Sequence, residues 1–433
     1  MTAPAEASSG RTDRLRALAP GLREAARRFG TPLYVTDDAT LGDAVAELRA
    51  AFPDPWIRQY SVKANDVPAV IARVTGPGRD LGANVVSRGE WRLARAAGLT
   101  NERISLEGVG KTDADLAAAV RAAADGQPLL WTALESPEEA AAIADRARRA
   151  GLGRAGRPPL DVLLRLNPDV VPETQAALAV GAGSSKFGMT ETELSATVER
   201  LASSDGAVRP RGIHLHVGSQ LGAVDAWRDA VRRGLALLGL LRGGLSSIDT
   251  IDVGGGFAIV EPDGAAPRPE RFARELPELL EAIPADRRPT RFAIEPGRFV
   301  VARAGWLVGR VLHVRDRGGR QVVLDTGMTE LIRPALYGAD HPIVALTSDG
   351  HPLEPGDPPA HAERTIVHGP ICESTDELGT HDLPLLRRGD LVAIRDAGAY
   401  AASQSSAYNG RPRPAQVIVE TDGRLTLGRA RGR

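Results

Sequence analysis

Lysine is scarce in this sequence, and the scarcity makes each lysine informative. Of the 54 lysine and arginine residues, only Lys63, Lys111 and Lys186 are lysines. An arginine guanidinium stays protonated, whereas a desolvated amine can lose its proton and attack a carbonyl. A lysine that is kept in such a chain is therefore a candidate for Schiff-base chemistry, with an ordinary ion pair as the simpler alternative.

Cysteine is nearly absent, since Cys372 is the only one in 433 residues. A single cysteine excludes an intrachain disulfide framework and a multi-cysteine metal site. We expect no metal centre. The roles that remain for Cys372 are those of a small buried hydrophobe or a reactive thiol.

Long apolar runs and a large net charge are missing as well. No stretch approaches about 18 consecutive apolar residues, and the first twenty residues lack the apolar core of a secretion signal. The formal net charge of -1 argues against nucleic acid or an anionic membrane as a partner. We therefore expect a cytoplasmic protein that acts on a small molecule.

Short apolar segments alternate with alanine-rich amphipathic stretches through most of the chain. Strand candidates begin at residues 56, 82, 103, 128, 160, 212, 248 and 291, and the helical stretches include 88–97, 112–124, 136–150, 190–203, 224–242 and 269–283. Eight such units over about 250 residues predict a closed (β/α)8 barrel, whose active site lies at the C-terminal ends of its strands. A doubly wound open sheet is the alternative.

The two ends of the chain do not continue this alternation of strands and helices. Residues 1 to about 30 are expected to be disordered at first and then helical, and 31–37 reads as a strand. Strands with turn residues and little helix follow residue 300, which predicts an antiparallel β domain with a proline-rich surface loop at 351–363. We expect three parts. Residues 1–37 form an N-terminal segment whose strand packs on the β domain, residues 38–300 form the barrel, and residues 301–433 form the β domain.

Polar signatures follow several of the predicted barrel strands. Lys63 ends the first strand, while Lys111 and Lys186 fall in loops. The segment H-L-H-V-G-S-Q places His214 and His216 on one strand face, although a lone histidine here is more often structural. The seventh and eighth strands end in D-V-G-G-G and E-P-G-R, which offer backbone N–H groups to an anion and a carboxylate, Glu295. Tight turns and an ion pair between Glu295 and Arg298 are the simpler explanations.

A reactive lysine, a phosphate-binding turn and a carboxylate in one barrel mouth describe a site for pyridoxal 5'-phosphate. The carboxylate would keep the pyridine nitrogen protonated, which makes the ring an electron sink. The segments YSVKAN, HVGSQ, DVGGG, EPGR, RPALY, GPICEST and DAGAY resemble, in this order, the signatures of the barrel-type (fold type III) pyridoxal-phosphate amino-acid decarboxylases. Within that family the chain looks most similar to the diaminopimelate decarboxylases, over residues 31 to about 420.

The resemblance implies decarboxylation of meso-diaminopimelate to L-lysine and CO2, a step of lysine biosynthesis, and a role for each matching residue. Lys63 would carry the cofactor covalently, His216 would stack on its ring, and Glu295 would pair with its ring nitrogen. The phosphate would be held by Ser219, Gly254, Gly255, Gly256, Gly297 and Tyr400, with Arg298 nearby. Arg298, Arg333, Tyr337, Glu373 and Tyr400 would contact the substrate.

The resemblance also implies a homodimer with shared active sites. Cys372 would donate the proton after CO2 leaves, and Glu373 would face the distal amine. In this family these residues come from the neighbouring subunit. We therefore expect Cys372, Glu373 and Tyr400 to reach into the barrel of the other chain.

Three departures from the family pattern affect the expected substrate. Asn84 stands where the family usually has Asp, which removes a charge near the cofactor. The loop at 171–188 keeps its closing S-K-F-G but lacks the usual His/Tyr-containing pattern, and Thr375 replaces a usual Gly.

Rival functions remain open at this point. A sister decarboxylase would act on ornithine, carboxynorspermidine or a glutamyl group on a carrier protein. A racemase would share the lysine without needing Cys372 and Glu373. A binding protein that has lost its chemistry would not need Lys63, Glu295 and Cys372 together.

Overall fold

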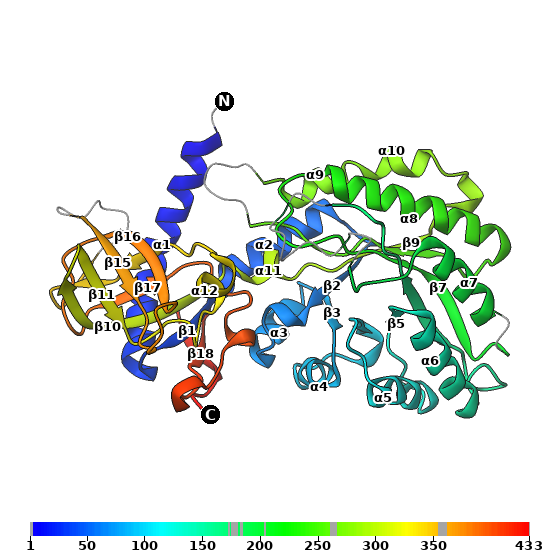
Figure 1. Cartoon of the computed structure of the whole chain (residues 1–433), viewed down its shortest axis with the longest axis horizontal. Helices are drawn as coiled ribbons and strands as arrows, with labels where there is room; N and C mark the ends of the chain where they lie inside the picture. Colours follow the sequence, from blue (N-terminus) through cyan, green and yellow to red (C-terminus); the bar gives the residue numbers. More distant parts are fainter. Residues whose placement is uncertain are drawn as a thin grey trace.

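The computed structural model describes residues 3–171, 174, 181, 185–202, 205–259, 266–353 and 362–432. It contains a closed eight-stranded parallel barrel and a separate β sheet. Figure 1 shows the barrel with its helices at one end of the molecule and the sheet at the other. The predicted fold class, a (β/α)8 barrel with a second β domain joined by the N-terminal strand, is confirmed, and the doubly wound sheet is excluded.

All eight predicted barrel strands are present. They are β2 (Ile57–Ser61), β3 (Gly82–Val85), β4 (Ile104–Leu106), β5 (Trp131–Leu134), β6 (Leu160–Arg165), β7 (Val208–His214), β8 (Thr250–Asp252) and β9 (Arg291–Ile294). Parallel pairing between β2 and β9 closes the barrel, so all the carboxyl ends lie on the same rim. The sixth strand begins at Val208 and ends at His214, so His216 lies in the loop after it and not on the strand as expected.

Helices cover the outside of the barrel. They are α2 (Asp38–Ala51), α3 (Pro68–Thr75), α4 (Arg88–Ala96), α5 (Asp113–Ala124), α6 (Pro137–Arg149), α7 (Glu191–Ala202), α8 (Asp225–Gly244), α9 (Pro269–Ala273), α10 (Leu276–Glu281) and α11 (Arg298–Val301). Side chains of Ser87, Thr112 and Ser136 cap three of them. The stretch predicted at 269–283 forms two helices, because Pro277 has no N–H to continue the first.

The second sheet is mixed and not purely antiparallel as expected. Its strands are β1 (Leu33–Asp37), β10 (Gly305–Asp316), β11 (Arg320–Leu324), β12 (Ile343–Ala345), β15 (Glu363–His368), β16 (Glu377–Leu383), β17 (Leu391–Ile394), β18 (Ala415–Val419) and β19 (Leu425–Arg429). The N-terminal strand β1 lies between β10 and β18, and it pairs with β18 in parallel. A second parallel pair joins β11 and β15. The other pairs are antiparallel.

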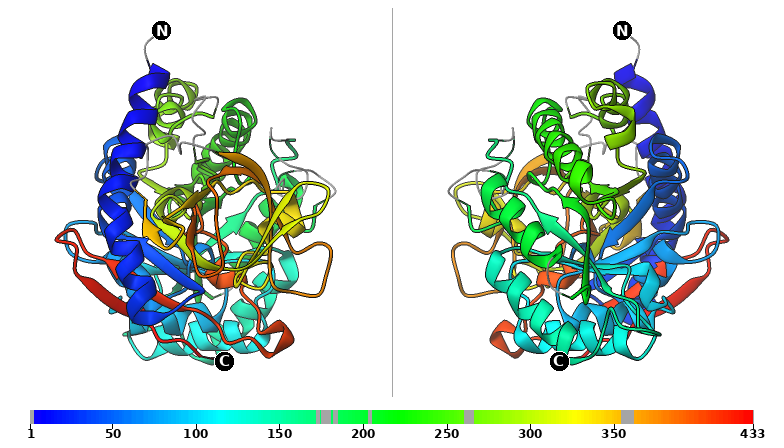
Figure 2. Two further views of the ribbon diagram at one scale, coloured as in Figure 1. Left: turned by 90° about the vertical axis from the view of Figure 1, so that its left-hand side faces the viewer. Right: turned by 90° about the vertical axis from the view of Figure 1, so that its right-hand side faces the viewer.

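The N-terminal helix packs on this second sheet. Helix α1 spans Ala3–Phe29, so the helix expected in this segment is present. Leu18 and Leu22 are buried against Val35 and Val308 of the sheet, and Figure 2 shows the helix running along one side of the molecule. The predicted loop at 351–363 begins with the short strand β14 (His351–Pro352), and residues 354–361 lie outside the described part. No described helix has the length and apolar character needed to cross a membrane.

Tight backbone contacts join the β domain to the barrel beside Lys63. The backbone N–H of Gly398 donates to the carbonyl of Ala302, and the Gly398 carbonyl accepts from the Asn65 side chain at 3.0 Å. The Tyr400 N–H donates to the carbonyl of Ala64 at 2.7 Å. The turn that carries Lys63 is thus held by residues more than three hundred positions later.

Gly398 leaves no room for a side chain at this junction. A Cβ there would overlap the carbonyl oxygen of Val301. We expect Gly398→Ala to lower the free energy of unfolding by about 1–3 kcal/mol, the usual cost of overpacking. Urea unfolding checks this, with Gly244→Ala as the control, because a Cβ at Gly244 meets nothing within 4 Å. Equal stabilities of the two variants would contradict the close junction.

Candidate active site

Lys63 lies in a single turn, Val62–Ala64, directly after β2. Its half-buried side chain lines one cavity together with residues from several strand ends, namely Ser61, His216, Ser219, Gly256, Phe257, Glu295, Gly297, Arg298 and Tyr400. The other two lysines are engaged elsewhere. Lys111 is buried and pairs with Glu139 at 3.1 Å, and the Lys186 amine lies 5.5 Å from the ring centre of Phe187. Lys63 is therefore the lysine amine that faces the cavity.

Glycines let three backbone segments approach each other closely beside this cavity. Gly254 and Gly256 follow β8 with φ values of +72° and +97°, a region that favours glycine. A Cβ on Gly256 would lie 2.6 Å from the Gly218 carbonyl, and Cβ atoms on Gly254 and Gly255 would overlap the carbonyls of Leu215 and Glu295. The predicted glycine turn is thus a close crossing of loops, with its backbone next to Ser219 and Gly297.

His216 is held as a neutral ring. The Gly255 N–H points at its Nδ1 atom at 3.4 Å. Burial, together with the nearby positive charge of Lys63, lowers the pKa of His216 well below its usual value. A neutral ring fixed beside Lys63 can lie flat against an aromatic ligand without adding a second positive charge.

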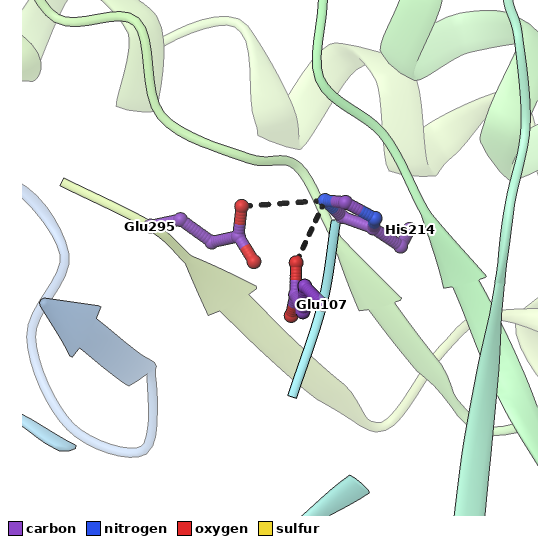
Figure 3. Close-up of side chains that lie close together, drawn as sticks. All are labelled: Glu107, His214 and Glu295. Carbon is purple, nitrogen blue, oxygen red and sulfur yellow. Dashed lines mark hydrogen bonds and ion pairs between the residues drawn. The ribbon is translucent and has the colours of Figure 1, made fainter. Parts of the chain in front are cut away.

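Glu295 is buried at the end of β9 and has two side-chain partners from distant strands. Its Oε1 accepts from the Asn84 amide at 2.5 Å, and its Oε2 lies 3.2 Å from Nε2 of His214 (Figure 3). Burial lowers the pKa of His214 to about 4, so this histidine is neutral. Among the described residues no ion pair joins Glu295 to Arg298, so the simple ion-pair explanation for E-P-G-R is excluded.

Arg298 begins α11 and points to the other side of the cavity. Its guanidinium donates to the hydroxyl of Ser219 at 3.2 and 3.3 Å, and it lies 4.7 Å from the ring centre of Tyr400. Burial lowers the pKa of Arg298. Neither the Ser219 hydroxyl nor the Tyr400 ring neutralises the positive charge of Arg298, so the guanidinium can bind an acidic ligand group.

Arg333 lies at the start of α12 (Arg333–Tyr337) and shares a neighbouring cavity with Arg298. Its Nε lies 3.4 Å from Nε2 of His341, and its guanidinium lies 5.6 Å from the ring centre of Tyr337. Burial and the positive charge of Arg298 lower the pKa of Arg333 to about 10. Two buried guanidiniums thus border one cavity, and no described carboxylate pairs with either.

The structure does not bring Cys372 and Glu373 to the cavity of their own chain. Both are exposed on the β domain, where Glu373 accepts from the Tyr408 hydroxyl at 2.7 Å and the Cys372 sulfur lies 3.8 Å from the Asn409 amide. Tyr400 differs from the expectation. It lines the cavity of its own chain, because its N–H binds Ala64 of the Lys63 turn. The expectation that Tyr400 reaches into the other chain is therefore wrong.

Two further groups of polar residues at the strand ends were not anticipated. Glu107, directly after β4, is buried with its Oε2 3.3 Å from Nε2 of His214. Arg165 ends β6 and donates to Glu135 at 2.7 Å, and Glu135 also accepts from the N–H of Gly188. The signal was present, because each charged residue ends a predicted barrel strand.

Comparison with known proteins defines the class. Residues 39–302 match the model of the pyridoxal-dependent decarboxylase family, pyridoxal binding domain. The chain belongs to this family, and pyridoxal phosphate is its cofactor. Within the family it belongs with the diaminopimelate decarboxylases. It is 36% identical to that of Aquifex aeolicus over 95% of this chain and 91% of the relative, and 35% identical to that of Deinococcus radiodurans over 92% of each.

Solved structures agree with this assignment. The crystal structure of diaminopimelate decarboxylase from Helicobacter pylori complexed with L-lysine superposes with a TM-score of 0.84 at 27% identity, covering 95% of this chain and 96% of that one. A lysine/ornithine decarboxylase from Vibrio vulnificus complexed with putrescine shares the fold, with a TM-score of 0.75 at 21% identity.

The residues around Lys63 fit pyridoxal phosphate chemically. The cavity offers an amine for the aldehyde, a buried carboxylate for the ring nitrogen and a neutral imidazole for the ring face. Ser219 lines the cavity together with Gly256 and Gly297, and a hydroxyl beside a glycine-rich backbone can bind a phosphate. The Gly254 and Gly255 N–H groups have the Asp252 carboxyl and His216 Nδ1 as partners. These groups come from the ends of β2, β7, β8 and β9, which converge because the barrel is closed.

Proposed function

We propose that the protein decarboxylates meso-diaminopimelate to L-lysine and CO2 as a cytoplasmic homodimer with shared active sites. One observation carries the proposal. The cavity beside Lys63 is lined by a buried carboxylate, Glu295, and a buried arginine, Arg298, and Arg298 also lines a neighbouring cavity together with the buried Arg333.

Bound pyridoxal phosphate supplies an electron sink for the carbanion left when CO2 departs. The protein holds this group in place and sets its charge. Lys63 binds it covalently, Glu295 holds the proton on its ring nitrogen, and His216 lies against its face. Ser219, Gly297 and the turn of Gly254, Gly255 and Gly256 bind its phosphate, with Tyr400 beside them.

The two arginines support a substrate with a second carboxylate. Burying a guanidinium without an anionic partner is costly, so a site with two such groups favours an acidic ligand. Diaminopimelate carries a carboxylate at its far end, whereas ornithine does not. Arg298, Arg333 and Tyr337 are therefore assigned to the distal carboxylate.

Exposure of Cys372 and Glu373 supports a site completed by a second chain. A group that delivers a proton to the substrate has to contact it, and Cys372 is exposed and does not line the cavity of its own chain. In a dimer, the partner's copy of this surface would cover the cavity. Cys372 is then the proton donor, and Glu373 binds the distal amine.

The direct test is CO2 release from a panel of amino acids. We expect release from meso-diaminopimelate, a large loss in Lys63→Ala, and near-normal activity in the control Lys186→Ala, since the Lys186 amine lies against the Phe187 ring and Lys186 does not line the cavity beside Lys63. Manometry or labelled CO2 measures the rate. Release from ornithine, carboxynorspermidine or a carrier-bound glutamyl group, with none from diaminopimelate, would assign the chain to a sister decarboxylase.

Shared sites predict complementation between two inactive variants. Lys63→Ala and Cys372→Ala chains are mixed under conditions where subunits exchange. About half of the dimers are then mixed, and each has one intact site, so roughly a quarter of the parent activity should return. Tagged chains show independently that exchange has occurred. If exchange occurs and no activity returns, Cys372 does not serve the partner's site.

A further inference from the structure

Glu107 is a buried acid that the proposed reaction does not use. Its Oε1 accepts from the indole N–H of Trp131 at 3.2 Å, and its Oε2 lies 3.3 Å from Nε2 of His214. The same Nε2 lies 3.2 Å from Oε2 of Glu295, as Figure 3 shows. The three atoms lie within 4.8 Å of one another. Two buried carboxyl groups therefore face a single ring nitrogen.

A neutral histidine cannot balance two buried negative charges. Burial lowers the pKa of His214 to about 4, so its ring carries one N–H, and its Nδ1 has no hydrogen-bond partner. Two ionised carboxylates at this distance repel strongly when both are buried, so one of them retains a proton. Burial and the nearby Glu295 raise the pKa of Glu107 to about 8. Each carboxyl group has one such hydrogen-bond donor, the Asn84 amide at 2.5 Å for Glu295 and the Trp131 indole at 3.2 Å for Glu107, so the shorter bond is made to Glu295.

Other charged groups lie near this pair. Lys63 and Arg165 are the nearby cations, and Arg165 is already paired with Glu135. Asp252 is the other buried acid that interacts with Glu295. Burial and Glu295 raise its pKa as well, and one of its oxygens accepts from the Gly254 N–H while the other has no partner. Asp252 is therefore the alternative to Glu107 as the buried acid that retains a proton.

We propose that Glu107 stores the proton for the cofactor's ring nitrogen. In the free protein Glu107 is a neutral acid beside ionised Glu295. When a pyridine nitrogen comes against Glu295, the proton passes from the Glu107–Glu295 pair to that nitrogen. One positive charge then lies beside two carboxylates, and the net charge is unchanged. Glu107 acts through Glu295 and is a positioning residue. The inference rests on the proposed placement of the ring nitrogen at Glu295.

Proton uptake on cofactor binding tests this without any turnover. Pyridoxal phosphate is titrated into the free protein by calorimetry in buffers of different ionisation enthalpy, which gives the number of protons taken from solvent. At neutral pH we expect Glu107→Gln to take up about one proton more than the parent, because its store is gone. Above about pH 8 the parent has already lost the Glu107 proton, so the difference between the two proteins should disappear.

Two controls identify the source of the proton. Asp252→Asn should bind the cofactor with the parent's proton count if Glu107 is the store. Asp325→Asn removes a half-buried acid of the β domain whose pKa burial also raises, and it should behave like the parent. An effect in Asp252→Asn with none in Glu107→Gln would overturn the proposal, as would equal proton uptake by the parent and Glu107→Gln at neutral pH.

A second variant keeps the test usable if Glu107→Gln folds poorly. The Trp131 N–H stabilises the ionised form of Glu107, so Trp131→Phe should raise the pKa of Glu107. The pH above which cofactor binding takes up a proton from solvent should then be higher than in the parent. An unchanged value of this pH would count against Glu107. The measurement involves no substrate. A difference in proton uptake in a protein that releases no CO2 would therefore refute the proposed reaction and leave the proton store standing.

Discussion

The whole site depends on one constraint, which is that the Glu295 carboxylate is buried and must be stabilised there. A buried charge is costly unless hydrogen-bond donors surround it. The Asn84 amide at the end of β3 and the neutral His214 at the end of β7 supply contacts at 2.5 and 3.2 Å. Because the barrel is closed, these strand ends reach Glu295 from several directions. The fold thus holds a carboxylate at a fixed place in the barrel mouth.

The second domain contributes by holding the active lysine in position. Tyr400 binds the backbone carbonyl of Ala64, Gly398 accepts from the side chain of Asn65, and the Ser403 hydroxyl donates to the Lys63 carbonyl at 2.9 Å. The same segment places the Tyr400 ring against Arg298. The cavity is therefore built by both domains of one chain. Cys372 is exposed and does not line this cavity.

Local sequence patterns predicted the barrel, its eight strands and the residues that end them. This was possible because the spacing of apolar residues and the choice of turn residues depend only on neighbouring positions. These patterns were also enough to single out Lys63 and the glycine turn after β8. The partners of Glu295 could not be predicted, since Asn84 lies 211 positions away and only the closed barrel brings them together. Tyr400 was expected at the active site of the other chain, and that prediction was wrong because it too concerns residues far apart in the sequence. Its contact with Ala64 depends on how the two domains pack.

Replacement of Glu295 by glutamine tests the central claim most directly. If Glu295 holds the proton on the ring nitrogen, Glu295→Gln should keep a nearly normal cofactor content, while kcat for diaminopimelate falls by orders of magnitude. The two quantities are measured on the same preparation by absorbance and by CO2 release. Near-normal kcat at full cofactor content would show that Glu295 only supports the local structure, and would contradict the account.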